Sequence, residues 1–172
     1  MFIFLLVFLD QFIKLIVYTF LSNVKFNIFN NFFGFRSLLN SNHLSVFNSD
    51  FLNINININI LIILNIFICL FLISLLKYFR HIKIKTTAIY TSLLLFIAGG
   101  ISSTIDRIFW GGSLDYVILL GYIIDLKDIY LFVGSIIILI IVIKNLDFKK
   151  SNKKDMLVIK NYFVFIKDAC KK

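Results

Sequence analysis

Four aspartates with the potential for chemistry lie close together in this chain: Asp106, Asp115, Asp125 and Asp128. The chain has nine acidic residues, all of them aspartates. Asp106 and Asp128 border apolar runs, where a carboxylate is poorly solvated. Two facing carboxylates in such a place can share one proton, so that the ionised one polarises a water and its protonated partner donates to a carbonyl oxygen. Chance clustering in a surface loop is the alternative interpretation.

Asp115 and Asp128 both lie between the third and fourth apolar runs or at their border. If they form such a pair, we expect their carboxylates to lie on the order of 3–6 Å apart, within reach of one shared water.

A second polar group interrupts the first apolar run, at Asp10-Gln11-Phe12-Ile13-Lys14. Asp10 and Lys14 are four positions apart, so on a helix they share one face and can neutralise each other. We expect both to face other helices rather than lipid. Two roles remain open, an ion pair that stabilises helix packing and a contact with substrate. A third hypothesis uses Asp10, Lys14 and the later aspartates as a proton or cation pathway.

The elements that carry these residues are four apolar runs, at residues 2–21, 58–76, 87–105 and 128–143. A membrane-spanning helix needs about 20 mostly apolar residues. The composition, 60% hydrophobic and only 16% charged, excludes a soluble enzyme and a disordered chain. We expect an all-α membrane protein with four transmembrane helices in one domain (1–143), followed by a basic cytoplasmic tail (144–172).

The positions of the basic residues predict the orientation of these helices. Of 18 Lys and Arg residues, four lie at positions 77–85 and nine follow residue 143. By the positive-inside rule both clusters are cytoplasmic. Both termini are then inside, and segments 23–57 and 106–127, with the paired aspartates, lie at the outer face. A net charge of +9 arranged in this way does not indicate nucleic-acid binding, since no folded polar domain carries it.

Smaller features add three expectations. The Asn-Ile alternation at residues 53–60 has the period of a strand, so we expect a small extracytoplasmic β or loop element between the first two helices; low-complexity drift is the alternative. Residues 156–166 are apolar between lysines and can lie along the inner membrane surface. The two histidines and two cysteines have no metal-ligand spacing, so we expect no metal.

Taken together, these residues resemble the lipoprotein signal peptidase (signal peptidase II) family of bacterial membrane aspartic proteases. Its Asp-Gln-x-x-Lys motif matches Asp10, Gln11 and Lys14. Its later motifs are Gly-Gly…Asn-x-x-Asp-Arg…Gly-x-x-x-Asp and Asn-x-x-Asp-x-x-x-x-x-Gly. They are matched, with some substitutions, by Gly99, Gly100, Ser103, Asp106, Arg107, Gly111, Asp115, Asp125, Asp128 and Gly134.

The resemblance implies an intramembrane aspartic endopeptidase that removes signal peptides from diacylglyceryl-modified prolipoproteins, cleaving before the lipidated cysteine. It implies that Asp115 and Asp128 are the catalytic pair and that no cofactor is needed. Prolipoprotein substrates and membrane lipid are the expected partners, and the expected state is a monomer. Substrate binding or structural support is implied for Asp10, Gln11, Lys14, Ser103, Asp106, Arg107, Gly111 and Asp125.

Three positions depart from the family pattern. Ser103 and Asp125 stand where the family usually has Asn, and Lys127 stands where it usually has Ala. The hydroxyl of Ser103 still offers a hydrogen bond, whereas Asp125 adds a charge that Lys127 can offset. The alternative to a protease is therefore a non-catalytic membrane relative that acts as a binding or assembly protein.

Overall fold

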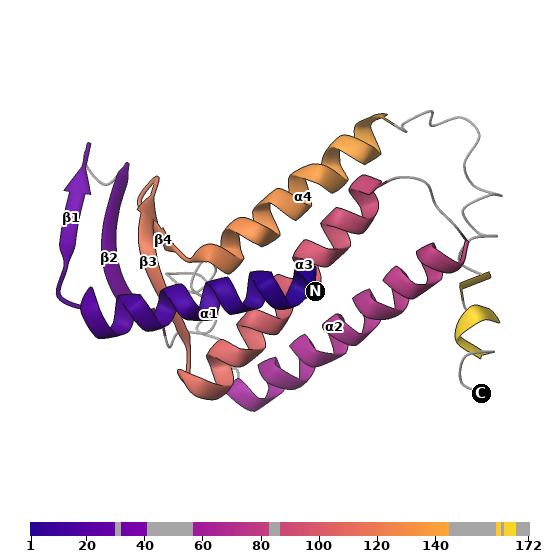
Figure 1. The fold of residues 1–172 in the computed structure, drawn as a ribbon, viewed down its shortest axis with the longest axis horizontal. Helices are drawn as coiled ribbons and strands as arrows, with labels where there is room; N and C mark the ends of the chain where they lie inside the picture. The colour runs from indigo at the N-terminus through magenta and orange to yellow at the C-terminus, as the bar shows by residue number, and fades with distance from the viewer. Residues whose placement is uncertain (30–31, 41–56, 83–86, 145–160, 163, 168–172) are drawn as a thin grey trace.

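In the part of the chain that the structure describes, four long helices are joined to a small antiparallel sheet (Figure 1). The computed structural model describes residues 1–29, 32–40, 57–82, 87–144, 161–162 and 164–167. Its helices are α1 (Phe2–Phe20), α2 (Ile58–His81), α3 (Thr87–Phe109) and α4 (Leu126–Lys144). Each is long and apolar enough to cross a membrane. The expected class, four transmembrane helices, is confirmed.

Three helices extend beyond the apolar runs. α2 continues to His81 and α3 to Phe109. The basic residues at the end of α2 interact favourably with the negative end of the helix dipole. α4 begins at Leu126 rather than at residue 128 because Asp125 and Asp128 cap it reciprocally. Asp125 Oδ1 accepts the N–H of Asp128 at 3.1 Å, and Asp128 Oδ2 accepts the N–H of Asp125 at 3.2 Å.

The sheet is assembled from two segments that are far apart in the sequence. Its strands are β1 (Lys25–Ile28), β2 (Phe33–Asn40), β3 (Ser113–Leu119) and β4 (Tyr122–Ile124), in the order β1-β2-β3-β4. The β element expected between the first two helices is confirmed, but half of the sheet comes from the segment between α3 and α4. We call the end of the bundle at which this sheet lies the sheet end (Figure 1).

The Asn-Ile alternation does not form a strand where the structure describes it. Ile58–Ile60 form the first turn of α2, and the Asn57 side chain caps that turn by accepting the N–H of Asn59 at 3.0 Å. The strand expectation is therefore wrong for residues 58–60, because a capped start joins them to the long apolar helix that follows. Residues 53–56 lie outside the described residues.

α3 is the central helix and packs against α1, α2 and α4. Two adjacent glycines allow this close packing. A Cβ at Gly99 would lie 2.8 Å from Leu131 Cδ2 of α4, and a Cβ at Gly100 would lie 2.6 Å from Cys69 Sγ of α2. Small residues let helix backbones approach closely in a membrane. The two glycines therefore let α4 and α2 pack closely against the C-terminal half of α3, the half nearer the sheet end.

The described part of the C-terminal segment packs against α2. The Tyr162 hydroxyl donates to Ser74 Oγ at 3.1 Å, and the Phe165 ring lies 5.5 Å from that of Tyr78. Most of residues 145–172 lie outside the described part of the chain, so the expected contact of this segment with the inner membrane surface stays a prediction.

Candidate active site

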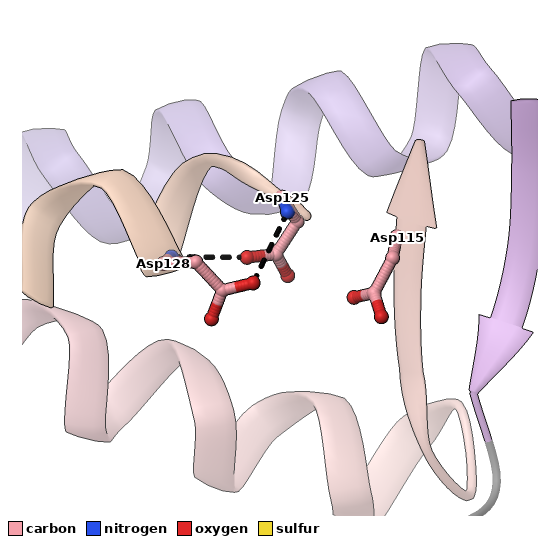
Figure 2. A group of neighbouring side chains, drawn as sticks. All are labelled: Asp115, Asp125 and Asp128. Carbon is pink, nitrogen blue, oxygen red and sulfur yellow. Dashed lines mark hydrogen bonds between the residues drawn. The ribbon is translucent and has the colours of Figure 1, made fainter. Parts of the chain in front are cut away.

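Three carboxylates converge at the sheet end of the bundle. Asp115 projects from β3 toward Asp125 and Asp128 at the start of α4 (Figure 2). Oxygen atoms of the three side chains lie within 4.8 Å of one another. Asp115 and Asp128 therefore lie within the separation expected from the sequence. The geometry allows both to contact one water molecule or one peptide carbonyl.

A pocket of about 240 Å³ opens beside this pair. It brings together residues from β2, α3, the turn after α3, β3 and α4. The lining residues are Asn40, Ser103, Asp106, Arg107, Gly112, Ser113, Asp115, Lys127, Asp128 and Leu131. Most of these side chains are polar or charged, so the pocket can accommodate a polar group beside the aspartates.

Two side chains hold the Asp115 carboxylate. Ser113 Oγ lies 2.6 Å from Asp115 Oδ1, and Asn40 Nδ2 donates to Asp115 Oδ2 at 3.2 Å. Ser113 and Asp115 are two positions apart on β3, so their side chains share one face of the sheet. Asn40 pairs with Ser113 in the register between β2 and β3. The sheet thus aims Asp115 into the pocket.

Lys14 connects α1 to the rest of the site. Its Nζ lies 3.0 Å from Asp10 Oδ2, 2.5 Å from Asp106 Oδ2 and 2.7 Å from Asp125 Oδ2. The Lys14 side chain is fully buried, as are those of Asp10 and Asp125. Asp10 and Lys14 therefore face the bundle interior as expected, and the pair acts as a junction between α1, α3 and the start of α4. This favours the ion-pair role over direct contact with substrate.

Gln11 adds hydrogen bonds to the same junction. Its Nε2 donates to Asp106 Oδ1 at 2.8 Å and to Asp10 Oδ2 at 3.1 Å. Asp10 Oδ1 in turn accepts the backbone N–H of Lys127 at 3.2 Å. Each residue of the Asp-Gln-x-x-Lys motif therefore has hydrogen-bonding partners outside α1.

Lys127 supplies a second buried ammonium group. Its Nζ contacts Asp125 Oδ2 and lies 3.2 Å from Asp106 Oδ2. The charge that Asp125 adds to the site is thus shared by Lys14 and Lys127. The two departures from the family pattern, at positions 125 and 127, form an ion pair with each other.

Ser103 and Arg107 lie on one face of α3, next to the pocket. Arg107 Nη1 donates to Ser103 Oγ and, at 3.1 Å, to the Ser103 carbonyl. The Ser103 hydroxyl thereby accepts the hydrogen bond that orients Arg107. Gly111, in the turn that leads from α3 to β3, has a φ of +66°, a conformation that favours glycine.

Burial and charge act differently on the two carboxylates that lie outside the helices. Burial raises the pKa of Asp115 above its ordinary value, although the Ser113 hydrogen bond and the Lys127 charge oppose this. For Asp125, burial also acts to raise the pKa, but the adjacent ammonium groups of Lys127 and Lys14 outweigh it and hold the pKa below its ordinary value. Asp125 is therefore an ionised partner of the lysines, whereas Asp115 binds a proton more readily.

Comparison with known proteins agrees with this arrangement. The sequence model of the family described as Signal peptidase (SPase) II matches residues 2–144. The chain belongs to the signal peptidase II family. It is 31% identical over 151 residues to a lipoprotein signal peptidase from Borreliella afzelii (strain PKo), an alignment that covers 81% of this chain and 85% of the relative.

Solved structures share the fold of this signal peptidase II family member. A bacterial membrane enzyme structure determined by the in meso method at 2.3 Å matches with a TM-score of 0.64 at 24% identity, covering 87% of this chain and 90% of the other. A second such structure, at 1.9 Å, matches with a TM-score of 0.63 at 24% identity and covers 83% and 90%. Family membership and the four apolar helices describe a multi-pass bacterial membrane peptidase.

Two residues of this signal peptidase II site were not found as candidates from the sequence, Asn40 and Ser113. Ser113 carries a local signal, because it lies two positions before Asp115 in a strand. Asn40 carries none, since its contact with Asp115 depends on the pairing of β2 with β3. Lys127 stands out in the sequence as a departure from the family pattern that can offset the charge of Asp125, but its contact with Asp106 depends on the packing of α4 against α3.

Asp115, Asp125 and Asp128 are close enough together to ligate a cation. However, the ammonium groups of Lys14 and Lys127 already contact Asp125. These lysines provide the positive charge that a metal ion would otherwise bring to Asp125.

Proposed function

We propose that this chain is an intramembrane aspartic endopeptidase that removes signal peptides from diacylglyceryl-modified prolipoproteins, cleaving just before the lipidated cysteine. The observation that carries the proposal is the convergence of Asp115 and Asp128 beside a polar pocket at the sheet end. Membership in the signal peptidase II family supports the substrate class. The charge pattern supports an outer location for this end, with both termini cytoplasmic.

In this proposal Asp115 is the ionised member of the pair and Asp128 holds the shared proton. Asp115 accepts hydrogen bonds from Ser113 and Asn40, and hydrogen bonds to a carboxylate favour its ionised form. Burial raises the pKa of Asp115, which makes the ionised group a stronger base than an exposed aspartate. Such a base suits the abstraction of a proton from water.

The reaction then proceeds in two balanced steps. Asp115 takes a proton from water as the water oxygen bonds to the scissile carbonyl carbon, and Asp128 donates its proton to the carbonyl oxygen, giving a neutral gem-diol. In the second step Asp128 takes a proton from one hydroxyl, Asp115 donates its proton to the peptide nitrogen, and the C–N bond breaks. The products are a carboxylic acid and an amine, and the pair returns to its starting protonation.

The remaining residues support this reaction without exchanging protons with the substrate. Lys14 joins α1 to Asp106 of α3 and to Asp125 at the start of α4, and these contacts hold the first turn of α4, with Asp128, in place. Arg107 lines the pocket and can donate to a carbonyl of the substrate. The bilayer restricts a lipid-anchored substrate to the plane of the membrane, so that proximity contributes to catalysis.

Replacement of either catalytic aspartate tests the proposal. In protein reconstituted into lipid with a diacylglyceryl precursor, we expect Asp115→Asn and Asp128→Asn each to lower the rate of signal-peptide release by about 10²–10⁴-fold, because each removes a general acid–base group. Mass spectrometry of the products gives the rate and the cleaved bond. Asp155→Asn, in the segment after α4, is the matched control and should cleave like the wild type.

Two outcomes would contradict the proposal. One is full cleavage by either variant, and the other is a folded wild-type protein that cleaves no lipidated precursor, which would favour the non-catalytic alternative. That alternative is not favoured, since all three departures, at Ser103, Asp125 and Lys127, have hydrogen-bonded or charged partners in the site. The cation-pathway hypothesis stays a prediction, to be tested by ion flux in proteoliposomes.

A further inference from the structure

The Lys127 ammonium group lies between two buried carboxylates and a hydroxyl. Its Nζ contacts Asp125 Oδ2 and lies 3.2 Å from Asp106 Oδ2. It also donates to Ser113 Oγ at 2.5 Å. Its side chain is only 7% exposed, so water contributes little to its solvation. The two carboxylates hold the ammonium, and the ammonium is directed at Ser113.

The contact with Lys127 determines how Ser113 can donate. An ammonium group has donors and no acceptor, so the Ser113 oxygen accepts from Lys127. The hydroxyl has a single hydrogen, which must then point toward a carboxylate. Ser113 Oγ lies 2.6 Å from Asp115 Oδ1 and 3.1 Å from Asp125 Oδ2. Asp125 Oδ2 already contacts two ammonium groups. The nearer and less satisfied acceptor is Asp115.

We infer that Lys127 is a positioning residue for the proposed reaction: through the Ser113 hydroxyl it orients the Asp115 carboxylate and favours its ionised form. This inference rests on the proposed function of Asp115 as the base. Asn40 holds the second oxygen of Asp115. With Ser113 on one oxygen and Asn40 on the other, rotation of the carboxylate is restricted where it lines the pocket.

The pH dependence of the site follows from all the charged groups around Asp115. α1 contributes Asp10 and Lys14, α3 contributes Asp106 and Arg107, and the start of α4 contributes Asp125, Lys127 and Asp128. These are five carboxylates, counting Asp115, and three cations, so the site has an excess of negative charge. Loss of Lys127 increases that excess and also frees the Ser113 hydroxyl to turn away. Both effects make ionisation of Asp115 harder.

The test compares Lys127→Met, Ser113→Ala and the double variant with wild type. Because the base must be ionised, we expect each single variant to shift the acidic limb of the cleavage profile upward by about one pH unit, equivalent to about tenfold in rate at a fixed pH on that limb. If Lys127 acts through Ser113, the double variant should shift by less than the sum of the single shifts. Lys25→Met, at an exposed lysine of β1, is the matched control.

Infrared titration of the Asp115 carboxyl in the absence of substrate, assigned by difference against Asp115→Asn, gives a second measurement. It reports the same upward shift whether or not the protein cleaves anything. Failure of the proposed function, a wild type without cleavage, is therefore distinguishable from failure of this inference. An unchanged Asp115 titration in folded Lys127→Met overturns the inference. If that variant does not fold, an unchanged titration in Ser113→Ala overturns it equally.

Discussion

At the scale of single residues, the site depends on an unequal balance of buried charge. Asp10, Asp106 and Asp125 form ion pairs with Lys14 or Lys127. Asp115 and Asp128 are left without such a close cationic partner among the described residues. Carboxylates this close cannot both ionise easily. The ion pairs thus separate three carboxylates that contact lysines from Asp115 and Asp128, the pair that shares one proton in the proposed function.

Asp125 and Lys127 should have opposite effects on this pair. Asp125→Asn removes a negative charge beside Asp115. The pKa of Asp115 should then fall, because the charge of Asp125 helps to raise it. The acidic limb of the cleavage profile should then move to lower pH, as a base with a lower pKa stays ionised in more acidic solution. Asn remains a good N-cap for α4, so the helix start is retained. The pH profile of cleavage measures this shift.

An upward shift in Asp125→Asn would contradict the assignment of Asp115 as the base. Asp125→Ala serves as a comparison, since it removes the cap as well as the charge. It should also lower the free energy of unfolding by about 0.5–2 kcal/mol.

At the scale of elements, the site depends on where α4 begins and where α3 ends. The reciprocal cap of Asp125 and Asp128 starts α4 at Leu126, which places Asp128 in the first turn. α3 extends past the apolar run to Phe109, which places Asp106 and Arg107 beside that turn. Close packing at Gly99 keeps the two helices together just above the site.

A larger side chain at Gly99 should separate α3 from α4. Gly99→Val would collide with Leu131, and overpacking of this kind costs about 1–3 kcal/mol. We expect a lower midpoint of thermal unfolding in detergent and weaker cleavage, because the distance from Asp106 to Lys127 would increase. Ser135→Val, at an exposed position of α4, is the matched control. Equal stability of the two variants would show that the close approach at Gly99 is not needed.

At the scale of the whole molecule, one end of the bundle carries all the described chemistry. α1 leads into β1, α3 leads into β3, and β4 leads into α4, so three of the four helices meet the sheet at the same end (Figure 1). The N-terminus of α1 and the C-terminus of α4 point away from it. Basic residues cluster at and beyond the C-terminal ends of α2 and α4, which point away from the sheet end (Figure 1).

Labelling of single cysteines tests the resulting orientation. In a background of Cys69→Ala and Cys170→Ala, a membrane-impermeant thiol reagent applied to intact cells should label Lys25→Cys on β1. It should label Lys77→Cys near the end of α2 only after the membrane is permeabilised, because basic residues remain on the cytoplasmic side. Labelling of Lys77→Cys in intact cells would reverse the proposed orientation and move the pocket to the inner face.

The sequence alone determined the elements and the strongest candidates in the site. The lengths of the apolar runs predict four spanning helices, because a helix satisfies all its backbone hydrogen bonds within the segment, as lipid requires. A spacing of four places Asp10 and Lys14 on one helix face, and the spacing of aspartates around two helix ends indicates a paired site. These features depend on local chemistry, which can be followed along the chain.

The contacts between these groups are specified by the packing of distant segments. Asn40 reaches Asp115, 75 positions away in the sequence, through the register of β2 and β3. Lys14 reaches Asp106 and Asp125 through the packing of three elements. The Asn-Ile alternation favoured a strand by its period, yet its described part is helix because a cap and a long apolar run continue it. Such contacts depend on residues distant in the sequence, and no local pattern specifies them.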